Sequence, residues 1–211
     1  MTPYERSRGK PYAETFRCPG GALCLDFCNT GQGMRGSSGE EWLASYSDLV
    51  TWLDAAGALT RRQAAALRAA AERAPDAAQK VWNRAIRLRE ALARALLAKS
   101  EGQRPAVEDL ALLDSEYARS ARFARLAATD EGFRWALDEV EEPDALLRPL
   151  VESAIAFMTS QRMARLRRCG NQTCYWLFVD ETKNCSRRWC EMASCGNLMK
   201  VRRHRERQRS A

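Results

Sequence analysis

The sequence contains no long apolar segment and only one histidine among its 211 residues. No stretch approaches the eighteen or so uncharged apolar residues of a membrane-spanning helix, so we expect no membrane partner. The polar start, MTPYERSRGK, is not followed by the apolar segment of a secretory signal. We therefore expect a cytoplasmic protein, in which the eight cysteines are metal ligands or free thiols rather than a disulfide framework.

The scarcity of histidine also bears on catalysis. The single one, His204, lies in a strongly basic C-terminal segment, and no nucleophile–base pair is visible elsewhere. We predict no catalytic residues, and we expect a protein that is not an enzyme.

Positive charge is concentrated at one end of the chain. The net charge is +7, but residues 161–211 carry a balance of +9 and residues 1–160 a balance of −2. This asymmetry predicts a C-terminal module that contacts a polyanion, although a merely solvated basic tail is the simpler alternative.

The apolar periodicity predicts an α+β protein with a mainly helical domain over residues 1–160. Helices are expected at residues 40–56, 61–74, 76–100, 105–117 and 143–160. Residues 122–127 and 133–140 flank a turn and are expected to form a hairpin. A small zinc-binding module with two cysteine knuckles, a short hairpin and a basic helix is expected over residues 161–211.

Several helix ends are marked by capping residues. Ser37 or Ser38 is expected to begin the first helix and Gly57 to end it, while Thr60 begins the second. Pro149 is expected to interrupt the last helix of the domain.

The segment GGALCLDFCNT, residues 20–30, is expected to be a short strand between turn residues. A strand would place Leu23, Leu25 and Phe27 on one face. Asp26 and Asn29 could then either line a polar ligand pocket or tie down the end of the strand.

Five cysteines gather in the C-terminal module. Cys169 and Cys174 form one C-x4-C pair, and Cys190 and Cys195 form a second pair fifteen residues later. Two such knuckles can hold one structural Zn²⁺. Cys185 and Cys190 are also five positions apart, so spacing alone does not select four ligands from five. We favour the two knuckles and expect Cys185 to be a spare thiol.

Other arrangements of these groups carry less weight. His204 is more readily explained as a face residue of the basic helix than as a ligand, and buried free thiols are the alternative to any metal. Cys18, Cys24 and Cys28 lack a fourth ligand for a second site.

The module has few apolar side chains with which to fold. We expect its core to consist mainly of Trp176, Phe178, Trp189 and Met192. Burial alone is insufficient at this size, so a bound zinc ion would supply the remaining stability.

Residues 166–209 resemble the CGNR zinc-finger family. The matching residues include RRC with Cys174 after it, then WLFVD, SRRWC, MASCGN and the basic tail. The resemblance implies zinc binding by the four paired cysteines. The sequence departs from the family pattern at Leu198, where the family has its namesake arginine, and at Cys185, where a small residue is usual.

The N-terminal segment GGALCLDFCNT also resembles the opening motif of the ABATE domain, which is described as a stress-induced transcription regulator and is the usual partner of the CGNR finger. This resemblance suggests sensing of a small molecule, for which Asp26 and Asn29 are the candidate ligand-binding residues.

The segment after Cys195 is expected to be a basic helix that contacts nucleic acid. Helical spacing places Lys200, Arg203 and Arg207 on one side and puts Arg202, Arg205 and Arg209 in a second stripe. The predicted nucleic-acid-binding residues are Arg187, Arg188, Asn197, Lys200, Arg202, Arg203, Arg205 and Arg207.

These features favour a zinc-finger transcription regulator that binds DNA. Trp176 and Trp189 could instead stack on unpaired bases, which would favour RNA or single strands, although we expect them in the core. A ligand-binding protein or enzyme with a purely structural zinc module is the competing hypothesis. The alanine-rich stretches 64–72 and 91–98 could pack within the chain or between the subunits of a homodimer.

Overall fold

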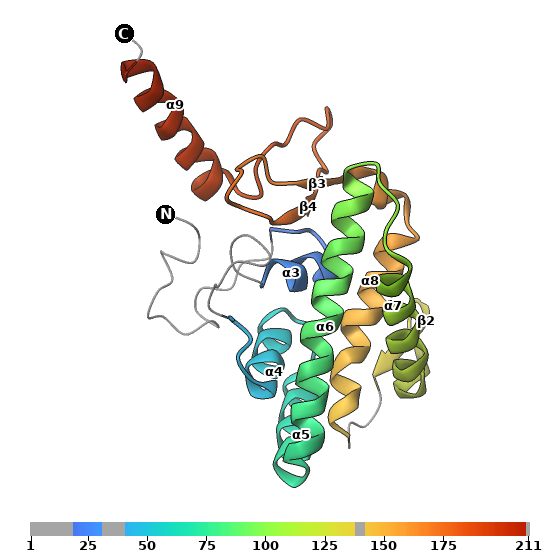
Figure 1. Ribbon diagram of the computed structural model, residues 1–211. Helices are drawn as coiled ribbons and strands as arrows, with labels where there is room; N and C mark the ends of the chain where they lie inside the picture. Colours follow the sequence, from blue (N-terminus) through green and yellow to red (C-terminus); the bar gives the residue numbers. More distant parts are fainter. Residues whose placement is uncertain (1–18, 31–40, 138–141, 210–211) are drawn as a thin grey trace.

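A computed structural model of the chain describes residues 19–30, 41–137 and 142–209. Its main body is a helical bundle arranged around one long helix, α6 (Figure 1). The bundle helices are α3 (Leu23–Asn29), α4 (Tyr46–Ala55), α5 (Arg61–Arg73), α6 (Pro75–Ser100), α7 (Val107–Ser120) and α8 (Arg148–Met158). No helix among these residues is both long and apolar enough to cross a bilayer.

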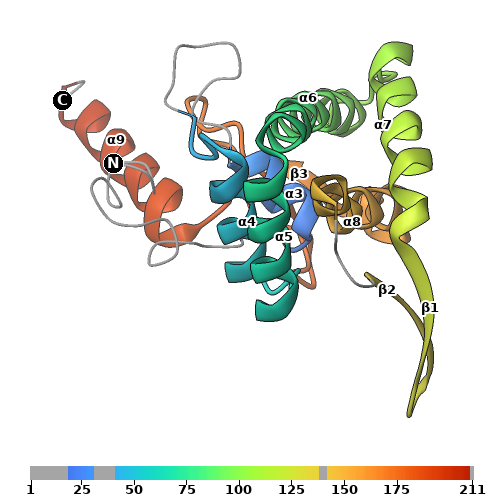
Figure 2. The ribbon, with the colours of Figure 1, turned by 90° about the horizontal axis from the view of Figure 1, so that it is seen from below.

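Two small antiparallel sheets accompany the bundle. Strands β1 (Ala124–Thr129) and β2 (Gly132–Leu137) form a hairpin that extends from the body (Figure 2). Strands β3 (Leu166–Arg168) and β4 (Leu177–Val179) form the second sheet, and the chain ends in helix α9 (Asn197–Arg209). The expected fold class, helical with short strands and a C-terminal helix, is confirmed.

Local signals determine most helix ends. The Thr60 hydroxyl accepts from the Gln63 amide while the Gln63 side chain accepts from the Thr60 amide, which makes a capping box at the start of α5. Gly57 takes a positive φ of 71° just after α4, and Pro75 opens α6. Pro149 lies in the first turn of α8, after a 3-10 turn at Pro143–Leu147, so the expected interruption is confirmed.

The start of α4 was predicted wrongly. The helix begins at Tyr46 rather than at residue 40, because the Ser45 hydroxyl accepts the Asp48 amide and so caps the first turn. The expected caps Ser37 and Ser38 lie outside the described residues.

Residues 20–30 also differ from the prediction, since they form helix α3 and not a strand. All side chains from Cys24 to Asn29 are buried, so neither face of the segment meets water. A fully buried short segment shows no clear polar–apolar period, and its sequence therefore does not distinguish strand from helix.

The β3–β4 hairpin lies between two groups of buried side chains. Leu166, Leu177 and Val179 belong to the core of the helical bundle. Phe178 points the other way and packs with the C-terminal cysteines, together with the partly buried Trp176 and Trp189. The expected fourth core residue, Met192, is 51% exposed. The C-terminal module therefore has a small buried cluster of its own around the cysteines and shares the other face of its hairpin with the core of the bundle.

The alanine-rich stretches are also occupied within the chain. Ala64 and Ala70 of α5 and Ala91, Ala93 and Ala95 of α6 are buried. These five alanines pack within the chain, whereas Ala65 of α5 is exposed.

The shared core makes a prediction for stability. Leu177→Ala should lower the free energy of unfolding by about 2–5 kcal/mol, because it leaves a cavity where the hairpin meets the bundle. Thermal unfolding followed at helical and at tryptophan wavelengths should show the same loss by both probes. The matched control is Val201→Ala on exposed α9, which should change stability by less than about 0.5 kcal/mol. A loss seen by only one probe would contradict the shared core.

Candidate metal centre

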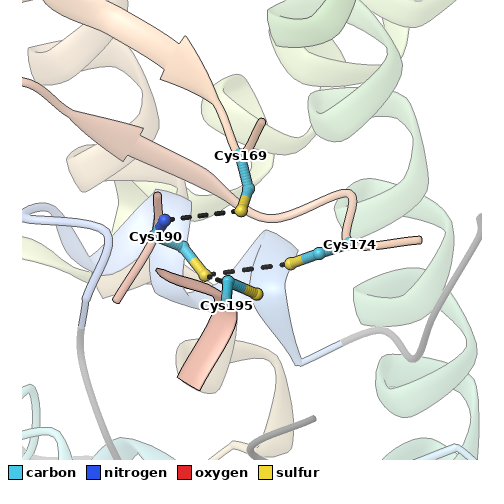
Figure 3. A group of neighbouring side chains, drawn as sticks. All are labelled: Cys169, Cys174, Cys190 and Cys195. Carbon is cyan, nitrogen blue, oxygen red and sulfur yellow. Dashed lines mark hydrogen bonds between the residues drawn. The ribbon is translucent and has the colours of Figure 1, made fainter. Parts of the chain in front are cut away.

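Four cysteine side chains converge on one point of the C-terminal module (Figure 3). The Sγ atoms of Cys169, Cys174, Cys190 and Cys195 all lie within 4.8 Å of one another, and all four residues are buried. Cys190 Sγ is 3.8 Å from Cys174 Sγ and 3.6 Å from Cys195 Sγ. The two pairs expected from the spacing are therefore the ones that meet.

These sulfurs fit a zinc ion. Tetrahedral Zn²⁺ with Zn–S bonds of about 2.3 Å holds its sulfurs about 3.8 Å apart, close to the separations seen here. Donors already point at the sulfurs: the Cys190 amide donates to Cys169 Sγ at 3.5 Å, and Asn171 Nδ2 donates to Cys195 Sγ at 3.5 Å. The four cysteines could hold one zinc ion, which in a closed set of thiolates supplies a structural cross-link.

The backbone around each pair explains how the thiols reach one another. Cys169 follows directly after β3, and the Cys174 amide donates to the Asn171 carbonyl to close the first knuckle. Cys195 lies in a π-helical turn, Met192–Gly196, that leads straight into α9. A Cβ on Gly196 would lie 2.4 Å from Met192 Sδ and 3.1 Å from the Trp189 ring, so a larger residue there would have to displace the Met192 side chain and would press on the Trp189 ring.

Hydrogen bonding polarises the thiols even without an ion. The neighbouring thiol of Cys174, followed by those of Cys190 and Cys195, lowers the pKa of Cys169 below its usual value. The Cys169 sulfur also accepts the Cys190 amide, and this hydrogen bond favours its thiolate form.

The remaining cysteines lie apart from this group. Cys185 is exposed, and its positive φ of 48° belongs to a turn in which its amide donates to the Thr182 carbonyl. Cys24 and Cys28 are buried in α3, where burial raises the pKa of Cys24 to about 12. Within the described part of the chain, only the four C-terminal cysteines form a group able to hold a metal. Cys18 lies outside it.

Arg187 takes a structural position that sequence reasoning missed. Its guanidinium donates to the carbonyls of Pro19, Val179, Trp189 and Cys190, and it lies 4.2 Å from the centre of the Phe178 ring. These contacts occupy the donors that we expected to reach nucleic acid. We therefore remove Arg187 from the predicted nucleic-acid surface and assign it to holding the module against the residues before α3.

Asp26 and Asn29 also act within the fold. Asn29 exchanges two hydrogen bonds with the backbone of Leu177, at 2.9 and 2.8 Å, and so ties α3 to β4. Asp26 Oδ1 accepts the Gly20 amide at 2.8 Å. Burial raises the pKa of Asp26 to about 7, against the opposing influence of the Gly20 amide and of Arg187. Of the two expectations for these residues, the described contacts correspond to tying down the segment, here a helix.

Other contacts between the module and the bundle were not foreseen. Trp176 meets Trp42 edge to face, with ring centres 6.2 Å apart. The buried Asp180 accepts the amides of Thr182 and Arg187, and hydrogen bonds led by the Thr182 hydroxyl lower the pKa of Asp180. No sequence signal could have linked Trp42 to Trp176, because 134 positions separate them. The Asp180 turn could have been predicted, because the pattern D-x-T after an apolar segment is typical of a turn.

The expected nucleic-acid residues of α9 lie on an exposed helix. Lys200, Arg202, Arg203, Arg205 and Arg207 are all exposed, as is Asn197 at its start. Arg188 is exposed as well, with its guanidinium 5.7 Å from the centre of the Trp189 ring. The helix leaves the body at the metal centre and projects away from it (Figures 1 and 2).

The geometry predicts how the metal content responds to substitution. The purified chain should carry one zinc ion, and Cys185→Ser should keep it, because the Cys185 thiol lies outside the group. Cys190→Ser should lose it, because the Cys190 sulfur approaches two of the other three. Elemental analysis of both variants measures this directly. Loss of zinc from Cys185→Ser, or its retention in Cys190→Ser, would contradict the assigned ligand set.

The pKa of Asp26 predicts a pH dependence of stability. Because the folded protein keeps this carboxyl protonated up to about pH 7 and the unfolded chain ionises it near pH 4, folding becomes less favourable as pH rises between these values. Asp26→Asn should remove that loss, so the difference in unfolding free energy between variant and wild type should grow from pH 4 to pH 7 and then level off. Denaturant titrations at several pH values measure it, and a constant difference would contradict the prediction.

Comparison with known families agrees with this architecture. A family model named ABATE, described as "Putative stress-induced transcription regulator", matches residues 21–161, and a model described as "CGNR zinc finger" matches residues 165–208. No curated protein shows a significant match to the chain. The first match covers about two thirds of the chain and the second contains all four converging cysteines. The chain therefore belongs to the ABATE family and carries a CGNR zinc finger at its C-terminal end.

Proposed function

We propose that this protein is a transcription regulator that binds duplex DNA through α9. The zinc finger holds the N-terminal end of that helix in place. The single observation that carries the proposal is the exposure of α9 from Lys200 to Arg209, with Lys200 and five arginines against one carboxylate, Glu206. A helix of this kind has no apolar face with which to pack on its own chain. Its surface suits a polyanion instead.

The attachment of α9 supports the same conclusion. Cys195 lies two residues before the helix, and the π-helical turn joins the ligand to the first turn of α9 without a flexible linker. The finger is in turn held on the bundle by Asn29, Leu177 and Arg187. Because the turn between Cys195 and α9 is short, the basic helix keeps one orientation relative to the finger. A fixed orientation favours insertion of the helix into a DNA groove over non-specific electrostatic binding.

The expected contacts are of two kinds. The arginines and Lys200 would neutralise phosphates, which gives affinity without choice of sequence. Asn197 is exposed at the start of the helix, and its Nδ2 lies 3.4 Å from the Ala193 carbonyl. An asparagine in this position is suited to an adenine edge. Partial burial of Trp176 and Trp189 against the cysteines favours duplex DNA over the stacking of unpaired bases.

The role of the bundle in this proposal is to respond to a signal, in line with the stress-induced regulation that the family description names. Asp26 and Asn29 are committed to the fold, so a small effector would have to act elsewhere on the bundle. Since the bundle and finger share Leu166, Leu177 and Val179, a change of packing at the bundle would reach the finger through these side chains.

Salt dependence tests the proposal on the full chain loaded with zinc. Binding to a random duplex of about 30 base pairs should weaken with salt at a log–log slope of roughly −5, as expected when about six phosphates are neutralised. Arg203→Gln with Arg207→Gln should reduce the slope by about 2, since each lost contact removes about 0.9. Fluorescence anisotropy of a labelled duplex measures both values.

A matched control is Arg61→Gln with Arg73→Gln, which removes two exposed arginines from α5 and should leave the slope unchanged. The proposal fails if the wild-type chain does not bind duplex DNA at low salt, or if the α5 control weakens binding as much as the α9 variant.

A further inference from the structure

Exposed apolar side chains are concentrated along one edge of the bundle. Among the described residues, eight large apolar side chains are exposed, and six of them lie on α7 and on the β1–β2 hairpin. They are Val107, Leu110, Tyr117, Leu126, Phe133 and Trp135. The two elements follow one another in the chain and form one side of the molecule (Figure 2). We call these six residues the apolar edge.

Helix α7 is turned with its polar side toward the protein. Its buried positions include Asp109, Glu116 and Ser120. Arg94 pairs with Asp109 at 2.5 Å, and Arg84 pairs with Glu116 at 2.6 Å. An ordinary surface helix buries its apolar stripe and shows its charges to water. Helix α7 departs from this pattern in part: it buries Asp109 and Glu116 beside Leu113, and it leaves Val107, Leu110 and Tyr117 exposed among the charged Glu108, Asp114 and Arg119.

The exposed apolar residues of α7 have the helical spacing of side chains that can contact a single partner surface. Val107, Leu110 and Tyr117 are three and seven residues apart, which places them on one side of the helix. All three are exposed, and Val107 is exposed by 76%. Helix α7 therefore offers three apolar side chains on one side, with Asp114 between Leu110 and Tyr117.

The hairpin continues this apolar character. The register pairs Leu126 with Trp135 and Ala128 with Phe133, so these four residues share one face. Phe133 and Trp135 are exposed by 76% and 58%. At the base of the hairpin, Gln63 Nε2 donates to the Leu137 carbonyl at 2.9 Å. Two isolated strands with an uncovered apolar face are marginal in water, so the face requires a cover.

We propose that the apolar edge is the interface of a homodimer, in which a second copy of this chain covers it. From the exposed fractions, the six side chains present roughly 600 Å² of apolar surface per copy. That area is at the upper end of the ~300–600 Å² of the largest patch on a typical monomer, and it is about three quarters of the ~800 Å² that each partner buries in a standard interface.

The charges along the edge favour a second copy over an unrelated partner. Exposed Glu108 and Asp114 lie at the start and in the middle of α7, exposed Arg119 and Arg125 lie at its C-terminal end and in β1, and exposed Asp130 and Glu131 lie at the turn of the hairpin. A two-fold axis pairs the same surface with itself in opposite directions. A two-fold axis between Asp114 and Arg119 would place the acidic residues of α7 in one copy opposite Arg119 and Arg125 of the other, so this part of the edge is complementary to itself.

Sedimentation velocity of the full zinc-loaded chain tests the proposal between about 1 and 100 µM. We expect a species of twice the 23.8 kDa chain mass that dissociates on dilution. Leu110→Glu on α7 and Phe133→Glu on the hairpin should each raise the dimer Kd about ten-fold or more, because each places a charge in the covered surface. The matched control is Val201→Glu, which alters an exposed apolar residue of α9 and should leave the Kd unchanged.

Hydrogen exchange supplies a second measurement that does not depend on the variants. Amides of residues 107–120 and 124–137 should exchange more slowly at high than at low protein concentration, while those of α5 should not change. A wild-type chain that stays monomeric up to 100 µM would overturn the proposal and leave the edge to a different partner. A dimer that persists in both edge variants would overturn it as well. The proposal does not depend on nucleic-acid binding.

Discussion

The convergence of four sulfur atoms on one point is the constraint on which the C-terminal part of the structure depends. Sulfurs 3.6–3.8 Å apart cannot all carry negative charge without a cation between them. With zinc, the same crowding becomes a rigid cross-link between two turns that lie sixteen or more residues apart. The direction of α9 follows from it, because Cys195 belongs both to the cluster and to the turn from which the helix starts.

The cluster is supported from the bundle through one short hairpin. Strand β4 sends Leu177 and Val179 into the helical core and Phe178 toward the cysteines, so three consecutive residues connect the two parts. Asn29 fixes the position of β4 relative to α3, because its side chain forms hydrogen bonds with both the amide and the carbonyl of Leu177. One side of the β3–β4 hairpin therefore packs against the cysteines of the finger, and the opposite side packs into the core of the bundle.

The sequence predicts those features that are determined by neighbours along the chain. Paired cysteines, the Thr60 cap and Pro75 act within a few residues, and the metal group and helix ends they indicate agree with the structure. Features determined by distant partners could not be predicted. Helix α3 is buried on every side, so its sequence shows no period. Arg187 looked like a surface cation because the carbonyls it binds, such as that of Pro19, are brought to it only by folding.

The division of β4 between two cores has a consequence for how such proteins can be rearranged during evolution. A gene fusion that transferred residues 165–208 alone would bring the four ligands with it, but it would leave Leu166, Leu177 and Val179 facing water. The recipient protein would need an apolar surface on which Leu166, Leu177 and Val179 could pack, and a side-chain amide that could take the place of Asn29. This finger is therefore poorly suited to transfer between unrelated proteins on its own. We expect it to be inherited together with a helical bundle that can cover these apolar side chains.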